Sequence, residues 1–245
     1  MTALGSLTRR SVLGTLRDGD LIFAIGGPVA FFVCFNITLR NVIDTGGMSY
    51  PQYILPVIVV QAMIFTAMTT ADRAARDHLS GMGIRMRSLP ISALAPVTAR
   101  MLSASVRAVA ALAGALAVGY GFGFRLQAGF IDLVAFVGIA LVLSLALSLG
   151  ADAMGSVAGS TEAAGQVLLI PQLLLVMLST GIAPAQSFPS WLGPFVRNQP
   201  VSVIAETLRG LAVGDHVRIG ASLAWCAGLL VVFGAIAVKA QRRPR

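Results

Sequence analysis

Long apolar stretches dominate the chain and restrict what it can fold into. Six of them approach the length of about 20 residues that an α-helix needs to cross a bilayer. The chain is 56% hydrophobic and 11% charged, whereas soluble domains are about a quarter charged. The sequence therefore predicts an all-α integral membrane protein with six transmembrane helices. Their predicted ranges are Leu21–Leu39, Tyr53–Thr70, Ser103–Phe122, Leu133–Gly150, Val167–Ala183 and Ala221–Val238.

The basic residues predict how these helices are oriented. The chain has 18 Lys and Arg against 10 Asp and Glu. With both termini in the cytoplasm, 13 of the 18 lie on the cytoplasmic side, as the positive-inside rule requires. The other five are Arg40, Arg125, Arg197, Arg209 and Arg218. The basic excess thus indicates membrane orientation, and we expect no nucleic-acid partner.

A short amphipathic helix is predicted over residues 198–214, on the outer side before the last span. Asn198 suits an N-cap, Pro200 suits the first helical turn, and Gly214 is a natural stop. Apolar residues recur at helical spacing from Val201 to Ala212, while Ser202, Glu206 and Arg209 share the opposite face. The pattern favours a helix resting against apolar material and is typical of interfacial helices in many membrane proteins.

The rest of the chain reads as one membrane domain over residues 1–245. Residues 1–20 have the apolar and basic residues of an interfacial helix, with a disordered start as the alternative. Residues 71–100 form the longest cytoplasmic loop and include Asp72, Asp77, His78, Gly81 and several arginines. By composition this loop is either a solvated, lipid-facing surface or a docking element.

Few polar groups fall inside the predicted spans. Asn36, Gln61 and Gln172 are the strongest, and each either bonds a neighbouring helix or lines a candidate substrate path. Arg107 is the one charged residue in the spans, and we expect it to reach the cytoplasmic interface. No carboxylate or histidine lies within them, which argues against a proton- or sodium-coupled transporter.

Motifs for catalysis are absent from the sequence. Lys239 is the only lysine, and the Ala and Gln that follow it cannot form a GxxxxGK[ST] loop, so we expect no ATP hydrolysis by this chain. Asp72, Asp77 and His78 lie close together in sequence and could hold a metal or act as acid and base. A membrane-embedded lipid-modifying enzyme therefore stays an alternative, as does a non-transporting scaffold or immunity protein.

Four runs of the sequence are more specific than their hydropathy. The most specific reads Trp-Leu-Gly-Pro-Phe-Val-Arg-Asn-Gln-Pro-Val-Ser from Trp191 to Ser202, and the others are Arg85–Ser92, Ser160–Ala164 and Ser179–Gly214. These runs resemble the ABC-2-type transporter permeases, most closely their daunorubicin-resistance-type branch. The resemblance implies a permease subunit in a bacterial cell membrane, paired with a second copy or a sister permease and surrounded by membrane lipid. It also implies a separately encoded ATP-binding subunit that carries the ATP and Mg, and a drug, polyketide or cell-wall lipid as cargo.

The same resemblance assigns a coupling role to the cytoplasmic loop. In the family, a short helix in this loop is pushed by the ATP-binding subunit. The matching positions here are Arg85, Arg87, Leu89 and Pro90, with Asp77 and Gly81 upstream. Family members often carry an acidic residue close to the glycine, whereas this chain reads Asp-His-Leu-Ser-Gly from Asp77 to Gly81.

Overall fold

The computed structural model describes residues 19–43, 45–81, 95–215 and 217–242, and this part of the chain is helical without strands. The predicted N-terminal interfacial helix lies almost entirely outside the described residues, as do Arg85, Arg87, Leu89 and Pro90 of the coupling loop. The described elements are α2 (Asp20–Leu39), α3 (Tyr50–Leu79), α5 (Ala95–Gly121), α6 (Phe130–Gly155), α7 (Thr161–Met177), η1 (Ala185–Ser187), α8 (Gly193–Asn198), α9 (Pro200–Val213) and α10 (Ile219–Arg242).

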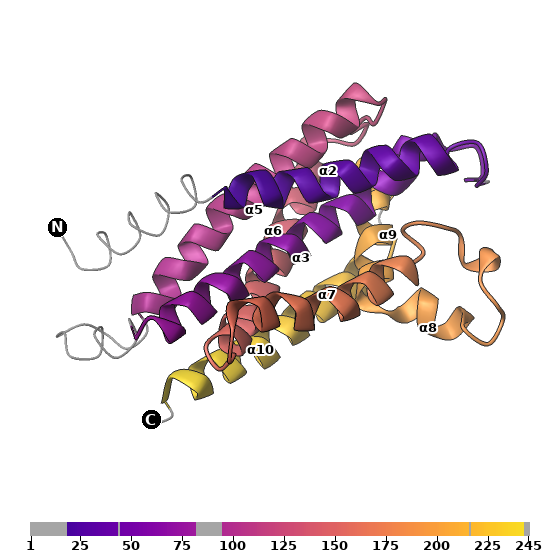
Figure 1. The fold of residues 1–245 in the computed structure, drawn as a ribbon. Helices are drawn as coiled ribbons and strands as arrows, with labels where there is room; N and C mark the ends of the chain where they lie inside the picture. Colours follow the sequence, from indigo (N-terminus) through magenta and orange to yellow (C-terminus); the bar gives the residue numbers. More distant parts are fainter. Residues whose placement is uncertain (1–18, 44, 82–94, 216, 243–245) are drawn as a thin grey trace.

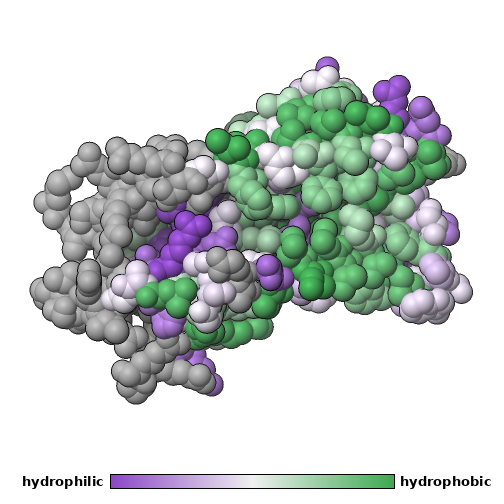
Figure 2. All heavy atoms as spheres, viewed as in Figure 1, coloured by the Kyte–Doolittle hydropathy of each residue, from purple (hydrophilic) through white to green (hydrophobic). Residues whose placement is uncertain are grey.

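Five of these helices are long and apolar enough to cross a membrane: α2, α3, α5, α6 and α10. On the face shown in Figure 2, hydrophobic residues cover most of the described surface, and hydrophilic residues lie toward its two ends. The helices run roughly along one direction, with α8 and η1 at one end (Figure 1). The end of α3 and the start of α5 lie at the opposite end. This arrangement is that of a multi-pass membrane protein.

Helix α3 is the centre of the bundle. It packs against α2, α5, α6, α7 and α9, and nearly all its apolar stretch is buried. Its 30 residues would span about 45 Å at 1.5 Å per residue, more than the hydrocarbon core of about 30 Å. The helix therefore continues past the predicted end at Thr70 and carries Asp72 and Asp77 on its last turns.

The fifth predicted span is shorter than expected. We predicted Val167–Ala183, but α7 ends at Met177, and residues 178–183 form a non-helical segment that is mostly buried. Among the described residues, α7 is an apolar helix below the length of the five long ones. It packs mainly against α3 and only slightly against α6. The physical reason for its early end lies in the side chains of α9, described below.

The predicted outer helix is present as α9, with two differences. Its N-cap is Gln199, while Asn198 ends the preceding helix α8. Gly214 ends α9 with a positive φ of 84°, which suits glycine. The second difference concerns the polar face: Ser202 is fully buried and Arg209 is largely covered. We expected only the apolar face to be covered, but α9 is packed on both faces because it inserts between α3, α6 and α10.

Candidate functional site

Two groups of charged and polar residues stand out, one near each end of the bundle. The first joins α9 to α3 and to the segment after α7, and we call it the Arg209 cluster: Tyr53, Thr180, Glu206 and Arg209. The second joins α3, α5 and α6, and we call it the Arg100 cluster: Asp77, Arg100 and Asp152. Each places an arginine among partners that are distant in the sequence.

Arg209 lies at the centre of the first cluster. Its guanidinium stacks on the Tyr53 ring, with 3.7 Å between Cζ and the ring centroid. Nε donates to the Tyr53 carbonyl at 3.1 Å, and Nη2 donates to the Thr180 carbonyl at 3.2 Å. Burial lowers the pKa of the Arg209 guanidinium, and the neighbouring Tyr53 and Glu206 raise it.

Glu206 is the acidic partner of the same cluster. Its Oε1 accepts a hydrogen bond from the Thr180 hydroxyl at 2.7 Å, and its Oε2 pairs with Arg218 at 3.1 Å. The Tyr53 hydroxyl donates to the Thr180 carbonyl at 2.6 Å. Thr180 thus bonds through both its hydroxyl and its carbonyl, and this fixes the chain directly after α7.

Side chains at the start of α9 form hydrogen bonds to the backbone where a further turn of α7 would otherwise have formed them. The Ser202 hydroxyl accepts a hydrogen bond from the Thr180 N–H at 3.0 Å. The Gln199 amide donates to the carbonyls of Leu175, at 3.0 Å, and Leu178. The last carbonyls of a helix have no partner within it, and irregular backbone at membrane depth is tolerated where protein covers it. These bonds explain why α7 ends at Met177.

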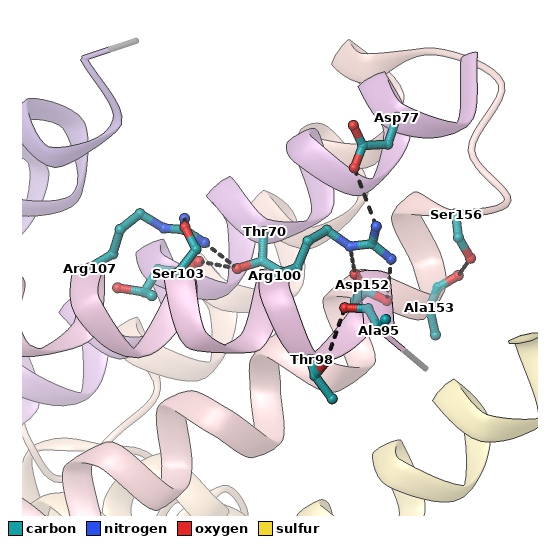
Figure 3. Close-up of polar contacts among 11 residues, drawn as sticks. Thr70, Asp77, Ala95, Thr98, Arg100, Ser103, Arg107, Asp152, Ala153 and Ser156 are labelled. Atoms are coloured by element: carbon teal, nitrogen blue, oxygen red, sulfur yellow. Dashed lines mark hydrogen bonds and ion pairs between the residues drawn. The ribbon is translucent and has the colours of Figure 1, made fainter. Parts of the chain in front are cut away.

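Arg100 occupies the centre of the second cluster (Figure 3). It forms a two-pronged contact with Asp152, from Nε to Oδ1 and from Nη2 to Oδ2, the second at 3.3 Å. Its Nη1 pairs with Asp77 Oδ2 at 3.3 Å. The side chain of Asp152 is 0% exposed and that of Arg100 is 11% exposed, whereas Asp77 is 37% exposed. The cluster is therefore buried on the Asp152 side and open on the Asp77 side.

The buried Asp152 corrects a sequence-based expectation. We predicted that the spans contain no buried carboxylate, with the fourth span ending at Gly150. Helix α6 instead continues to Gly155. Its extra turn stays buried because the fork geometry of arginine matches a carboxylate and compensates its charge. The partner, Arg100, lies 52 positions away in the sequence, where helix periodicity gives no signal.

Arg107 also differs from its predicted position. We expected it to reach the interface, but its side chain is fully buried. Nη1 donates to the Ser103 hydroxyl at 2.9 Å and Nη2 donates to the Thr70 hydroxyl at 2.7 Å (Figure 3). These hydroxyls on α5 and α3 receive the guanidinium inside the bundle, so it does not extend along the helix toward the interface.

The predicted substrate-path residues are all buried, and two of them lie in the same contact between α3 and α7. Val57 of α3 lies against Gly181, and Asp72 lies against Gly165, so the two helices run antiparallel. Gln61 is one helical turn from Val57, and Gln172 is two turns from Gly165, which places both in this contact. Both amides lack hydrogen-bond partners among the described residues. Asn36 is buried on α2, away from this pair in sequence and element.

Asp72, Asp77 and His78, the residues of the enzyme alternative, all lie on the last turns of α3. Asp77 is directed at Arg100, and the described residues contain no group of three or more side chains suited to a metal. Gly81 has a positive φ of 67° at the end of α3, and Pro200 starts α9 as predicted.

The sequence analysis missed Gln52, Gln199 and Thr180. Their hydrogen bonds link segments that are distant in the sequence and become neighbours only in the folded chain.

Comparisons with known proteins agree with this architecture. A sequence model described as ABC-2 family transporter protein matches residues 21–239. The doxorubicin resistance ABC transporter permease protein DrrB of Mycobacterium tuberculosis is 35% identical over 227 residues, covering 89% of this chain and 78% of the relative. The probable doxorubicin resistance permease DrrC of the same organism is 30% identical over 224 residues, covering 87% and 79%. The daunorubicin resistance permease DrrB1 of Streptomyces coeruleorubidus is 27% identical over 225 residues, covering 91% and 80%.

Proposed function

This chain belongs to the ABC-2 family of transporter proteins, and from that membership we propose how its helices and charged clusters serve transport. The protein is the permease subunit of an ABC exporter in the bacterial plasma membrane. The observation that carries this conclusion is the match to permeases over nearly the whole chain, including all five long helices.

The first proposal concerns the energy source. The sequence has no phosphate-binding loop motif, and its only lysine is Lys239 near the end of α10. A separately encoded ATP-binding subunit therefore supplies ATP hydrolysis and holds the ATP and Mg, and this chain binds no cofactor of its own. A second copy of the permease or a sister permease completes the membrane part.

The second proposal concerns coupling. The loop between α3 and α5 receives the movement of the ATP-binding subunit through Arg85, Arg87, Leu89 and Pro90. Asp77 and Gly81 lie on the α3 side of this loop. Support comes from the length of α3, which extends beyond the apolar core and carries the loop away from the membrane. The contact between Asp77 and Arg100 joins the two sides of the loop near its base.

The third proposal is a topology with six membrane segments and both termini in the cytoplasm. Helix α7 together with residues 178–183 forms the fifth segment, because the α9 side chains bond its last backbone groups. This orientation places the Arg100 cluster at the cytoplasmic end and the Arg209 cluster at the outer end. The distribution of basic residues supports it.

The fourth proposal concerns the cargo. The relatives are named for resistance to doxorubicin and daunorubicin, so a hydrophobic or amphipathic drug, polyketide or cell-wall lipid is the cargo class we propose. Gln61 and Gln172 are the groups that could bond to a polar part of such a molecule if α3 and α7 separate. Their buried, unbonded amides support this role. Asn36, buried on α2 at a separate place, is a third candidate for contact with the cargo.

Copurification tests the proposal directly. The protein is extracted from its native membrane in mild detergent, and its partners are identified by mass spectrometry. A stoichiometric ATP-binding subunit is the expected result, and a second permease in the same complex would make it a heterodimer. The purified complex should then hydrolyse ATP in lipid vesicles. A chain that purifies alone, from a host that encodes no such subunit beside it, would contradict the proposed energy source.

A further inference from the structure

At the base of the cytoplasmic loop, one arginine side chain contacts carboxylates of two other helices. Helix α3 leads into the loop and α5 leads out of it. Asp77 lies on the last turns of α3, and Arg100 lies on the second turn of α5. One guanidinium therefore connects the two helices that hold the loop, and the same guanidinium also holds Asp152 of α6 (Figure 3).

The two carboxylates hold Arg100 in different ways. Asp152 accepts two bonds from the guanidinium and is 0% exposed. Asp77 accepts one bond at 3.3 Å and is 37% exposed. A two-pronged, buried pair is stronger and more directional than a single-bonded pair that water reaches. The contact between α5 and α6 is thus the firm one, and the contact to α3 is the one that can break and re-form.

Helix α6 then connects this cluster to the other end of the molecule. Its first half contributes Phe136 and Ile139 to the main buried cluster, which also contains Ile204 and Leu208 of α9. It packs along α10 as well. Close-packed helices move as units, so a displacement of the inner end of α6 reaches the element that carries Arg209.

We propose that Arg100 is a positioning residue for transport. Arg100 passes movement of the cytoplasmic loop to α6 through its contact with Asp152, and Asp77 sets the resting position of the loop. The inference rests on the proposed function, since it requires an ATP-binding subunit that moves the loop. It differs from that proposal by assigning the transmission to one guanidinium and to α6. Without the Asp77 carboxylate, α3 is no longer held to Arg100 at the base of the loop, and less of the loop movement reaches α6.

The test follows the outer end of the molecule while ATP acts at the inner end. A fluorophore is attached at Ser190→Cys, an exposed position between η1 and α8. The background variants Cys34→Ser and Cys226→Ala remove the two free thiols. The complex with its copurified ATP-binding subunit is placed in lipid vesicles. ATP hydrolysis and the ATP-dependent change in fluorescence are measured together, so the outer response is expressed per ATP hydrolysed.

Four variants are compared with the unmodified complex. Asp77→Asn keeps the shape but removes the charge, and Asp77→Glu keeps the charge. Arg100→Lys keeps one charge but loses the two-pronged contact. Arg76→Gln is the control, because Arg76 is exposed on the same turns of α3. The thermal midpoint of each complex shows whether it is folded.

The expected result is a response per ATP that falls about threefold to tenfold in Asp77→Asn. Arg100→Lys should fall at least as far, while Asp77→Glu and Arg76→Gln should stay close to the unmodified complex. A structural role alone would lower the thermal midpoint and leave the response per ATP in folded complexes unchanged. An unchanged response in folded Asp77→Asn and Arg100→Lys would overturn the inference and leave the proposed function intact. An unmodified complex that neither hydrolyses ATP nor responds to it would overturn both.

Discussion

The Arg209 and Arg100 clusters use the same side chain in opposite ways. Arg209 is held by an aromatic ring and backbone carbonyls, with Glu206 nearby as part of a larger network. Arg100 is held by two carboxylates, one buried and one half open to water. The first arrangement supplies hydrogen-bond donors to the backbone carbonyls of α3 and of the segment after α7. The second joins three helices and keeps one contact within reach of water, so we expect the first to govern stability and the second to govern movement.

The largest effect should come from Arg209→Met. This change removes the hydrogen bonds to the carbonyls of Tyr53 and Thr180 and the stacking on the Tyr53 ring, while the Tyr53 hydroxyl still donates to the Thr180 carbonyl. A hydrogen bond to a charged group contributes about 1.5–3 kcal/mol, and Arg209 loses two of them together with the ring contact. The thermal midpoint in detergent should fall sharply, and size-exclusion chromatography should show aggregation. Arg209→Lys should recover little, because an ammonium cannot stack and bridge in the same way; a midpoint like that of the unmodified protein would end the distinction between the clusters.

The next effect should come from Gly181→Val, which tests the same end of the molecule without touching a charge. A Cβ at Gly181 would lie 2.4 Å from the Val57 Cβ, on rigid neighbouring backbone. Overpacking of this kind costs about 1–3 kcal/mol, and it should push the segment after α7 away from α3. The measurement is again the thermal midpoint. Gly220→Ala serves as the control, since no atom lies within 4 Å of its added Cβ, and equal midpoints for the two variants would contradict the packing.

A smaller effect is expected from Asp152→Asn in the Arg100 cluster. The amide keeps one acceptor for the guanidinium and loses the charge, while Asp77 still compensates Arg100 in part. A hydrogen bond to a charged group contributes about 1.5–3 kcal/mol, so the loss should be below that of Arg209→Met. Unfolding of the purified permease, followed by thermal shift, checks this order. A larger loss than in Arg209→Met would reverse the comparison.

The smallest effect on stability should come from Asp77→Asn. Exposed ion pairs contribute about 0–1 kcal/mol, and Asp77 is 37% exposed. Raising the salt from about 0.1 M to about 1 M shortens the screening length from about 10 Å to about 3 Å, and it should weaken this contact while leaving Arg209 unaffected. Thermal midpoints at the two salt concentrations measure the difference. If salt lowered the midpoint of Asp77→Asn as much as that of the unmodified protein, the half-open contact would not be the salt-sensitive one.

The sequence predicted the membrane segments and the outer helix from local patterns. The runs around Tyr53 and Ser103 lie within α3 and α5, although α5 begins at Ala95 and not at Ser103. Pro200 with Gly214 marked α9 to within two residues of its ends. The predicted spans for α3 and α6 ended before the helices do. Hydropathy marks only the part of a helix that lies in the apolar core, whereas the helix continues as long as its backbone hydrogen bonds are satisfied.

The contacts of the two clusters could not be predicted in this way. Arg209 reaches Tyr53 across 156 positions, and Arg100 reaches Asp152 across 52. A charged residue in an apolar sequence signals that a partner exists, but its identity depends on which helices become neighbours. The coupling positions Arg85, Arg87, Leu89 and Pro90 lie outside the described residues and stay a prediction from family resemblance.

The bonds between α9 and the end of α7 also bear on how the protein is made. The side chains of Gln199 and Ser202 follow their partners by 21 to 24 positions in the chain. Chains emerge from the ribosome from the N-terminus onward, so α7 enters the bilayer before these side chains are available. The last carbonyls of α7 therefore lack these hydrogen-bond partners until α9 has been synthesised. We therefore expect a chain that ends between α7 and α9 to hold its fifth segment less firmly in the membrane than the full chain does.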